Sequence, residues 1–207
     1  MLNLVLASAS PRRIELLKTI GLDFEIMPAN INEEPEGYND AGKYAMEMSR
    51  QKALAVAKKI RNTATEDTYV LGADTVVSID NIILGKPADK NHAFRMLKLI
   101  ENRWHEVITG LTLVNAKTLK SRTESELTRV KISPYPKGFL DRYLSTREPY
   151  DKAGSYGIQG YGSLMVECIE GCYFNVMGLP LFRLSRMLEK EGYDVLSWLN
   201  DSPEKKI

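Results

Sequence analysis

The segment from residue 69 to residue 84 limits the possible fold more than any other part of the sequence. Residues 69–79 form a run of apolar and β-branched residues interrupted by Asp74, and residues 82–84 are Ile-Ile-Leu. Asp80-Asn81 lies between the two runs and forms a two-residue turn of the kind that joins antiparallel strands. The sequence therefore predicts a β-hairpin with an acidic side chain inside its longer strand.

The rest of the chain alternates between strand and helix patterns around this hairpin. Ser10 suits the N-cap of a helix, Pro11 its first position and Gly21 its end. Residues 28–42 carry the composition of a loop. Further strands are predicted at residues 2–7, 105–114, 125–132 and 164–169, and helices at residues 11–20, 44–61, 89–100, 136–144 and 179–191. Without a repeat or an obvious linker, the pattern predicts one mixed α/β domain over residues 1–207, with two lobes.

The charge of the chain is almost balanced, so a charged ligand needs a local cluster of opposite charge. The 207 residues include 28 Lys and Arg and 27 Asp and Glu, a net charge of +1. No global field attracts nucleic acid or an anionic membrane. The sequence contains no basic stripe with stacking aromatics and no stretch near the roughly 20 apolar residues of a membrane helix. We therefore expect neither a nucleic-acid partner nor a membrane partner.

Cysteine usage and the N-terminus indicate a cytoplasmic protein. Cys168 and Cys172 are the two cysteines, too few for a disulfide framework and without the further ligands of a structural zinc site. Reduced thiols are typical of the cytosol. The basic residues of the N-terminus follow its short apolar run, which is the reverse of a signal peptide.

The first candidate ligand site is the Ser-Ala-Ser-Pro-Arg-Arg sequence at residues 8–13. The start of a helix offers unpaired N–H groups and a partial positive charge, and so it binds anions. Arg12 and Arg13 oppose the helix dipole, at a cost of roughly a few tenths of a kcal/mol each, unless an anion lies beside them. The pair therefore indicates a polyphosphate or polycarboxylate ligand. The alternative is two solvated arginines, and neither a Walker A nor a G-x-G-x-x-G pattern is present.

Three acidic residues are candidates for catalysis or metal binding. Asp74 lies among apolar strand residues, where a carboxylate is costly unless it is paired, protonated or bound to a metal. The alternative is a structural Asp that caps a turn. Lys52 and Lys86 add positive charge if the fold brings them to the same cleft. Glu33 and Glu34 offer the oxygen ligands that Mg²⁺ uses together with substrate phosphates, or else belong to an ordinary acidic loop.

Glycines are concentrated in residues 151–162. Gly154, Gly157, Gly160 and Gly162 are four of the 14 glycines of the chain. Such a concentration is typical of a loop that turns sharply or whose backbone approaches another group closely. We expect this loop to have a functional role.

Six short segments carry a family resemblance. They are LASASPRR at residues 6–13, GADTVV at 72–77, GKP at 85–87, HEVITG at 105–110, DKAGSYGIQG at 151–160 and NVMGLP at 175–180. Each is weak alone, but six in matching order are specific, and the chain resembles the Maf family of nucleoside triphosphate pyrophosphatases. The resemblance implies a mixed α/β fold related to inosine triphosphate pyrophosphatases, with a mixed sheet flanked by helices and two lobes around a cleft. It also implies a homodimer, a divalent cation (Mg²⁺ or Mn²⁺), and hydrolysis of a nucleoside triphosphate to the monophosphate and pyrophosphate.

The resemblance also assigns roles to individual residues. Asp74 matches the proton acceptor of the family. The phosphate and metal region is matched by Ser8, Arg13, Lys52, Lys86 and Lys152 for phosphate, and by Glu33 with Asp74 for the metal. Whether Asp74 acts as base, metal ligand or both stays open. Substrate choice is matched by Arg12, Thr75 and Gln159, which agree with the branch that acts on dTTP and UTP, whereas the 7-methyl-GTP branch carries Trp, Gln and Glu there.

Two alternatives to a dTTP and UTP pyrophosphatase are left. One is a pyrophosphatase for 7-methyl-GTP or for a broad range of nucleotides. The other is a regulatory protein of septum formation that binds a nucleotide without hydrolysing it. A panel of triphosphates tested for pyrophosphate release distinguishes the three.

Overall fold

The computed structural model describes residues 2–31, 38 and 40–196. The strands are β1 (Asn3–Leu6), β2 (Phe24–Ile26), β3 (Thr68–Ile79), β4 (Ile82–Leu84), β5 (Trp104–Asn115), β6 (Ser121–Ile132) and β7 (Val166–Glu170). The helices are α1 (Pro11–Thr19), α2 (Ala41–Ile60), α3 (Lys90–Ile100), α4 (Phe139–Tyr143), α5 (Tyr173–Met177) and α6 (Leu181–Lys190), and three 3₁₀ turns are η1 (Glu148–Asp151), η2 (Ala153–Ser155) and η3 (Gly160–Met165). None of the helices in this part of the chain combines the length and apolar character that crossing a membrane requires.

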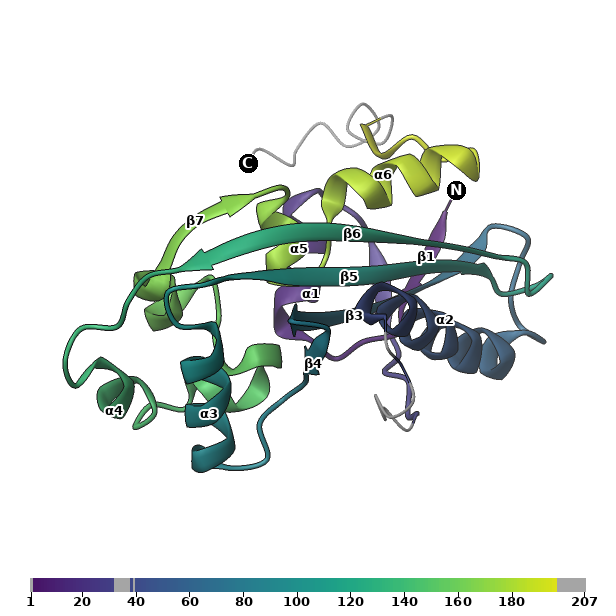
Figure 1. Ribbon diagram of the computed structural model, residues 1–207. Helices are drawn as coiled ribbons and strands as arrows, with labels where there is room; N and C mark the ends of the chain where they lie inside the picture. Colours follow the sequence, from purple (N-terminus) through teal and green to yellow (C-terminus); the bar gives the residue numbers. More distant parts are fainter. Residues whose placement is uncertain (1, 32–37, 39, 197–207) are drawn as a thin grey trace.

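The strands form a mixed sheet with helices on both of its faces (Figure 1). Their order is β2-β1-β3-β5-β6-β7, and β4 pairs with β3. β1 runs parallel to β2 and β3, whereas the later pairs are antiparallel. The predicted mixed α/β class is therefore confirmed.

The predicted hairpin is present as β3 and β4. Val77 pairs with Leu84 at one end of the ladder. Asp80 and Asn81 have φ angles of 51° and 63°, the positive values that a two-residue hairpin turn of type I′ requires. Asp74 lies in the middle of β3 with 6% of its surface exposed, so the carboxylate predicted inside the strand is buried there.

Helix α2 lies directly against β3 and β5 because two strand positions carry no side chain. A Cβ on Gly72 would lie 2.2 Å from the carbonyl oxygen of Ser49, and a Cβ on Gly110 would lie 2.2 Å from that of Ala45. Glycine in a strand is typical of such close backbone approach. The contact brings Lys52, which follows Ser49 on α2, within reach of β3.

Two hydrophobic cores form at opposite ends of β3. Because side chains alternate along a strand, Ala73, Thr75 and Val77 point to the same side of β3. Ala73 packs with residues of α1 and α6, and Val77 packs with residues of α3 and α4. Helix α2 packs on the other side, and Figure 1 shows α6 and α2 on opposite sides of the long strands. Thr75 therefore lies between the two cores.

The outer edge of β3 is open between the two cores. β1 pairs with residues 68–71 and β4 pairs with residues 77–79, so within the described residues no strand pairs with residues 72–76 on this edge. Asp74 and Thr75 are neighbours in this gap, and the alternation of the strand points them to opposite faces. A ligand bound at the gap therefore meets side chains from both faces of the sheet.

Several predicted boundaries were wrong for local reasons. Helix α2 begins at Ala41, inside the predicted loop 28–42, because the Asp40 carboxylate accepts a hydrogen bond from the Lys43 N–H. β6 begins at Ser121 rather than at residue 125. The first half of β6 carries polar side chains, which hid the strand pattern, but its backbone pairs with β5 and its acidic side chains bind Arg183 of α6.

The C-terminal third differs from the prediction in its short elements. β7 begins at Val166 rather than at residue 164, because the preceding residues form η3. Part of the glycine-rich segment is also wound into η1 and η2 rather than being an open loop. The sequence did not predict α5, a helix of five residues that ends at Gly178 with a φ of 110°, and α6 starts at Leu181.

The buried side chain of His105 gives the fold a specific pH dependence. His105 is 2% exposed, and its Nε2 atom lies 2.7 Å from the hydroxyl oxygen of Tyr156. Burial lowers the pKa of His105 to about 4. The unfolded chain therefore takes up a proton at this residue from pH 6.5 downwards, whereas the folded chain does so only near pH 4.

We expect the free energy of unfolding to fall by roughly 3 kcal/mol through this residue as the pH drops from 6.5 to 4. The measurement is urea denaturation of the wild type and of His105→Gln, which has no titrating group there, at several pH values. The difference in free energy of unfolding between the two proteins should shrink towards low pH, because only the wild type loses stability through residue 105. The titration of the carboxylates affects both proteins equally and cancels in the difference. Parallel curves would contradict the expectation.

Candidate active site

A cavity of about 1180 Å³ opens at the gap in the edge of β3. Its walls come from the start of α1, the middle of β3, the β3–β4 hairpin, the glycine-rich segment and the end of α5. It brings together nine of the residues that the sequence analysis selected, namely Ser8, Arg12, Arg13, Lys52, Asp74, Thr75, Lys86, Lys152 and Gln159. Glu33 and Glu34 lie outside the described residues.

The floor of the cavity is an ion pair between α2 and β3. Lys52 Nζ lies 2.6 Å from Asp74 Oδ1, and the two residues are 8% and 6% exposed. A buried charge is costly unless it is paired, and the close contact of α2 with Gly72 makes this pairing possible. The Asp74 side chain is therefore held at a fixed position on the cavity floor.

Arg13 ties the start of α1 to β3 and to the end of α5. Its guanidinium donates to Ser8 Oγ at 3.1 Å and to Thr75 Oγ1 at 3.1 Å, and Nε donates to the carbonyl oxygen of Gly178 at 2.9 Å. The planar guanidinium suits such fixed, divergent contacts. Arg13 is therefore part of the frame of the cavity in addition to being a cation on its wall.

A buried polar chain continues from Thr75 into the protein. Thr75 Oγ1 lies 2.9 Å from Thr109 Oγ1, which donates to the carbonyl oxygen of Asn175 at 3.1 Å. The Asn175 amide in turn donates to the carbonyl oxygen of Val107 at 2.9 Å and to Thr128 Oγ1 at 3.0 Å. Thr109 lies on β5 and is itself held by Asn175 of α5, so the contact with Thr109 fixes the orientation of the Thr75 hydroxyl.

The mouth of the cavity carries a second group of charges. Lys152 Nζ donates to Asp151 Oδ1 at 2.5 Å and to the carbonyl oxygen of Glu148 at 2.7 Å. Arg12 reaches the other oxygen of Asp151 at 3.5 Å. Although burial opposes the shift, Lys152 and Arg12 hold the pKa of Asp151 below its usual value. This carboxylate is therefore ionised at neutral pH.

The cavity as a whole favours an anion. The described residues place five cationic side chains on its wall, Arg12, Arg13, Lys52, Lys86 and Lys152, against the acids Asp74, Glu148 and Asp151. α1 adds its N-terminus, where Ser10 makes no side-chain cap and the first turn carries no acidic residue. Backbone N–H groups and the helix dipole at such an end favour negative charge. The arrangement suits a ligand with several phosphate oxygens.

Sequence reasoning missed three residues of this region. Glu148 and Tyr156 line the cavity, and the buried His105 contacts the hydroxyl of Tyr156. Tyr156 lies within the DKAGSYGIQG segment and His105 is the first residue of the HEVITG segment. Their presence in these two segments is the sequence feature that could have identified them. Glu148 precedes the motif and carried no signal of its own.

The fold and the site define a mixed α/β protein whose cavity, lined by cationic side chains, suits a phosphate ligand. Residues 3–191 match the family model described as "Maf-like protein". The chain belongs to this Maf-like protein family.

Its relatives are similar over nearly the whole chain. Proteins named dTTP/UTP pyrophosphatase include one from Acetivibrio thermocellus, 50% identical over 95% of this chain and 98% of the relative. Another, from Caldicellulosiruptor bescii, is 45% identical over 95% of this chain and 98% of the relative. A third, from Carboxydothermus hydrogenoformans, is 46% identical over 93% of this chain and 100% of the relative. A crystal structure of protein VC0702 from Vibrio cholerae covers 71% of the chain at 12% identity with a TM-score of 0.28, too low to support an argument.

Removing the partner of Asp74 should destabilise the protein. We expect Lys52→Met to lower the free energy of unfolding by roughly 2 kcal/mol, because it leaves a carboxylate unpaired at a site with little exposure. Adding Asp74→Asn should recover about half of this loss, since the remaining amide carries no charge. The measurement is urea denaturation of the two single variants and the double variant.

The matched control is Lys98→Met, which removes one partner of the exposed Lys98–Glu101 pair. Exposed pairs contribute about 0–1 kcal/mol, so the control should change little. Equal losses in Lys52→Met and Lys98→Met would contradict a buried pair at the cavity floor.

Proposed function

We propose that this protein hydrolyses the pyrimidine triphosphates dTTP and UTP to the monophosphate and pyrophosphate. The observation that carries the proposal is the gathering of five cationic side chains around one cavity, one of which, Lys52, is paired with Asp74. The names of the relatives, dTTP/UTP pyrophosphatase, support the substrate class. The proposal makes this chain a hydrolase that acts on the anhydride bond of a nucleotide.

In the proposed reaction a water molecule attacks the α-phosphorus and pyrophosphate leaves. The Asp74 carboxylate takes the proton of the attacking water, and Lys52, 2.6 Å away, keeps this carboxylate in place. Ser8, Arg13, Lys52, Lys86 and Lys152 bind the phosphate oxygens, where negative charge grows in the transition state. Catalysis of this kind depends on positioning and on cations rather than on a covalent nucleophile.

A divalent cation fits the residues around Asp74. Mg²⁺ is commonly bound by one or two carboxylates together with substrate phosphates rather than by a cage of protein ligands. Among the described residues, no group of three or more His, Cys, Asp or Glu forms such a cage, and Asp74 is the carboxylate on the cavity floor. We propose that Asp74 and Glu33 hold Mg²⁺ or Mn²⁺ with the triphosphate, and that the metal neutralises phosphate charge when bound.

Base recognition is proposed for Gln159, with Arg12 and Thr75. Gln159 is on the cavity wall, in the glycine-rich segment. Its amide offers one donor and one acceptor, which complement the O4 and the N3–H of uracil and thymine. A carboxylate only accepts, so it suits the donors on the edge of guanine.

Three further assignments remain proposals beside this one. We propose one domain over residues 1–207, a homodimer and a cytoplasmic location. Exposed apolar side chains such as Leu127 and Phe182, with 47% and 69% exposure, are available for contact between subunits. The described cysteines, Cys168 and Cys172, are both free thiols, as is usual in the cytosol.

The first test is a panel of nucleoside triphosphates assayed for pyrophosphate release with Mg²⁺ or Mn²⁺. We expect turnover of dTTP and UTP by the wild type, and a loss of at least about 10²-fold in kcat for Asp74→Asn because the proton acceptor is removed. Nucleotide binding by Asp74→Asn should persist. Chelation of the metal should abolish turnover by the wild type.

The same panel distinguishes the alternatives. Preferred turnover of 7-methyl-GTP, or equal turnover of many triphosphates, would replace the pyrimidine assignment. Binding of a nucleotide without turnover by either protein would favour a regulatory nucleotide-binding protein.

A second test changes the base-recognition residue alone. We expect Gln159→Glu to lower kcat/KM for dTTP and UTP by about tenfold or more, because the carboxylate cannot donate to O4. The free energy of unfolding should change little, since Gln159 lies on the cavity wall. Unchanged kinetics with both nucleotides would remove Gln159 from base recognition.

A further inference from the structure

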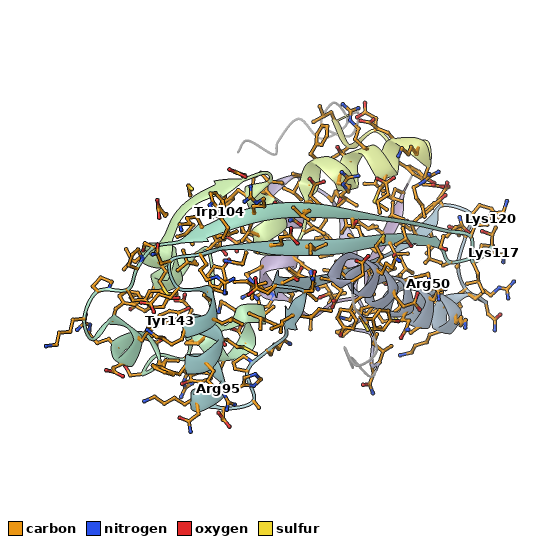
Figure 2. All side chains as sticks on the ribbon, in the orientation of Figure 1. Arg50, Arg95, Trp104, Lys117, Lys120 and Tyr143 are labelled. Atoms are coloured by element: carbon orange, nitrogen blue, oxygen red, sulfur yellow. The ribbon has the colours of Figure 1, made fainter. Side chains whose placement is uncertain are left out.

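Glu148 binds two segments of the chain with one carboxylate. Its Oε2 atom accepts a hydrogen bond from the N–H of Tyr161, and its Oε1 atom accepts one from the N–H of Gly162, each at 2.8 Å. The hydroxyl of Tyr143 also donates to Oε1, at 3.1 Å. Tyr143 lies on α4, at the end of the molecule opposite Lys117 and Lys120 (Figure 2). Glu148 therefore joins α4 to the start of η3.

The backbone of residues 157–162 is folded tightly around this carboxylate. A Cβ on Gly160 would lie 2.5 Å from Glu148 Oε2, and Gly160 has a φ of +69°, where side chains are rarely tolerated. A Cβ on Gly162 would lie 2.3 Å from the carbonyl oxygen of Gly157. The glycines of this segment thus allow the backbone N–H groups to reach Glu148.

Two residues proposed to contact the substrate on this side are connected to residue 148, Gln159 through the Glu148 carboxylate and Lys152 through the backbone. Gln159 immediately precedes Gly160, so its position follows from the segment that the carboxylate holds. Lys152 donates from Nζ to the carbonyl oxygen of Glu148 at 2.7 Å. The backbone carbonyl of Glu148 is thus hydrogen-bonded to one proposed phosphate ligand, and its carboxylate is hydrogen-bonded to the segment that carries the proposed base ligand.

The contacts argue against a chemical role for Glu148 itself. A carboxylate accepts about four hydrogen bonds, and three protein donors already point to this one. Two of them are backbone N–H groups, which are fixed in place by the loop. Although Glu148 lines the cavity, its oxygens are directed to the protein.

We propose that Glu148 is a positioning residue that sets nucleobase selectivity by holding Gln159 at the cavity wall. This inference rests on the proposed function, since it assumes that Gln159 contacts the base. Glutamine in place of Glu148 has one acceptor oxygen and one amino group. It keeps one backbone hydrogen bond and places a donor against the other N–H, so the segment must shift.

The test measures selectivity as the ratio of UTP to GTP, both in kcat/KM and, in an Asp74→Asn background, in the association constant 1/Kd. We expect Glu148→Gln to lower this ratio by about tenfold in both measurements, because Gln159 loses its fixed position. KM for UTP should rise more than kcat falls, since the lost contact is to the base and not to the reacting phosphate. Gly160→Ala, which displaces the same contact from the loop side, should have the same effect.

Two comparisons separate positioning from a merely structural role. In a Gln159→Ala background, Glu148→Gln should lower the ratio no further, because the residue through which it acts is gone. Glu101→Gln is the matched control, since Glu101 also accepts a backbone N–H, that of Tyr135, at 3.1 Å. This control should keep the wild-type ratio.

An unchanged ratio in Glu148→Gln, or a further full loss in the Gln159→Ala background, would overturn the proposal. The Kd ratio does not require turnover. A wild type that binds UTP without hydrolysing it would therefore overturn the proposed hydrolysis and still leave the role of Glu148 measured.

Discussion

The ion pair between Lys52 and Asp74 is the contact on which the site depends. It requires α2 to lie against β3 without intervening side chains, and Gly72 and Gly110 meet this requirement. It also requires Asp74 to fall where the outer edge of β3 is unpaired, between β1 and β4. A substitution that moved α2 outwards would therefore separate the pair without touching either partner.

The gap in the sheet edge explains how neighbouring residues serve different parts of the cavity. Asp74 and Thr75 point to opposite faces of β3, where Lys52 of α2 and Arg13 of α1 contact them. In a continuous sheet these two faces are separated by the neighbouring strand. Here the cavity passes around the edge, so a single ligand can meet cations from both layers of helices. A chain with a net charge of +1 thereby concentrates positive charge at one place.

Local patterns predicted much of the fold and many of the cavity residues. The hairpin followed from Asp80-Asn81, whose side chains tolerate positive φ, and the start of α1 followed from Ser10-Pro11. The resemblance to the Maf family selected nine residues that the structure places around one cavity. Their separate roles are still proposals, and Glu33 lies outside the described residues.

The remaining features were not predictable from local sequence because they depend on distant partners. The polar half of β6 is a strand because β5 pairs with it and α6 neutralises its acids. The five residues of α5 are too few for a helical period. The role of Glu148 has no signal in the neighbouring sequence, because its backbone donors, Tyr161 and Gly162, are brought to it only by the tertiary fold.

The continuity of β3 and β5 has a consequence for movement. Both strands are twelve residues long and take part in both hydrophobic cores. A cleft between domains joined by a linker closes by rotation about a hinge, but here β3 and β5 are paired without interruption from one hydrophobic core to the other. Narrowing the cleft as a rigid-body motion would have to twist both strands. We therefore expect the protein to adjust to a ligand by movement of side chains and of the connecting segments around the cavity, while β3 and β5 keep the two hydrophobic cores together.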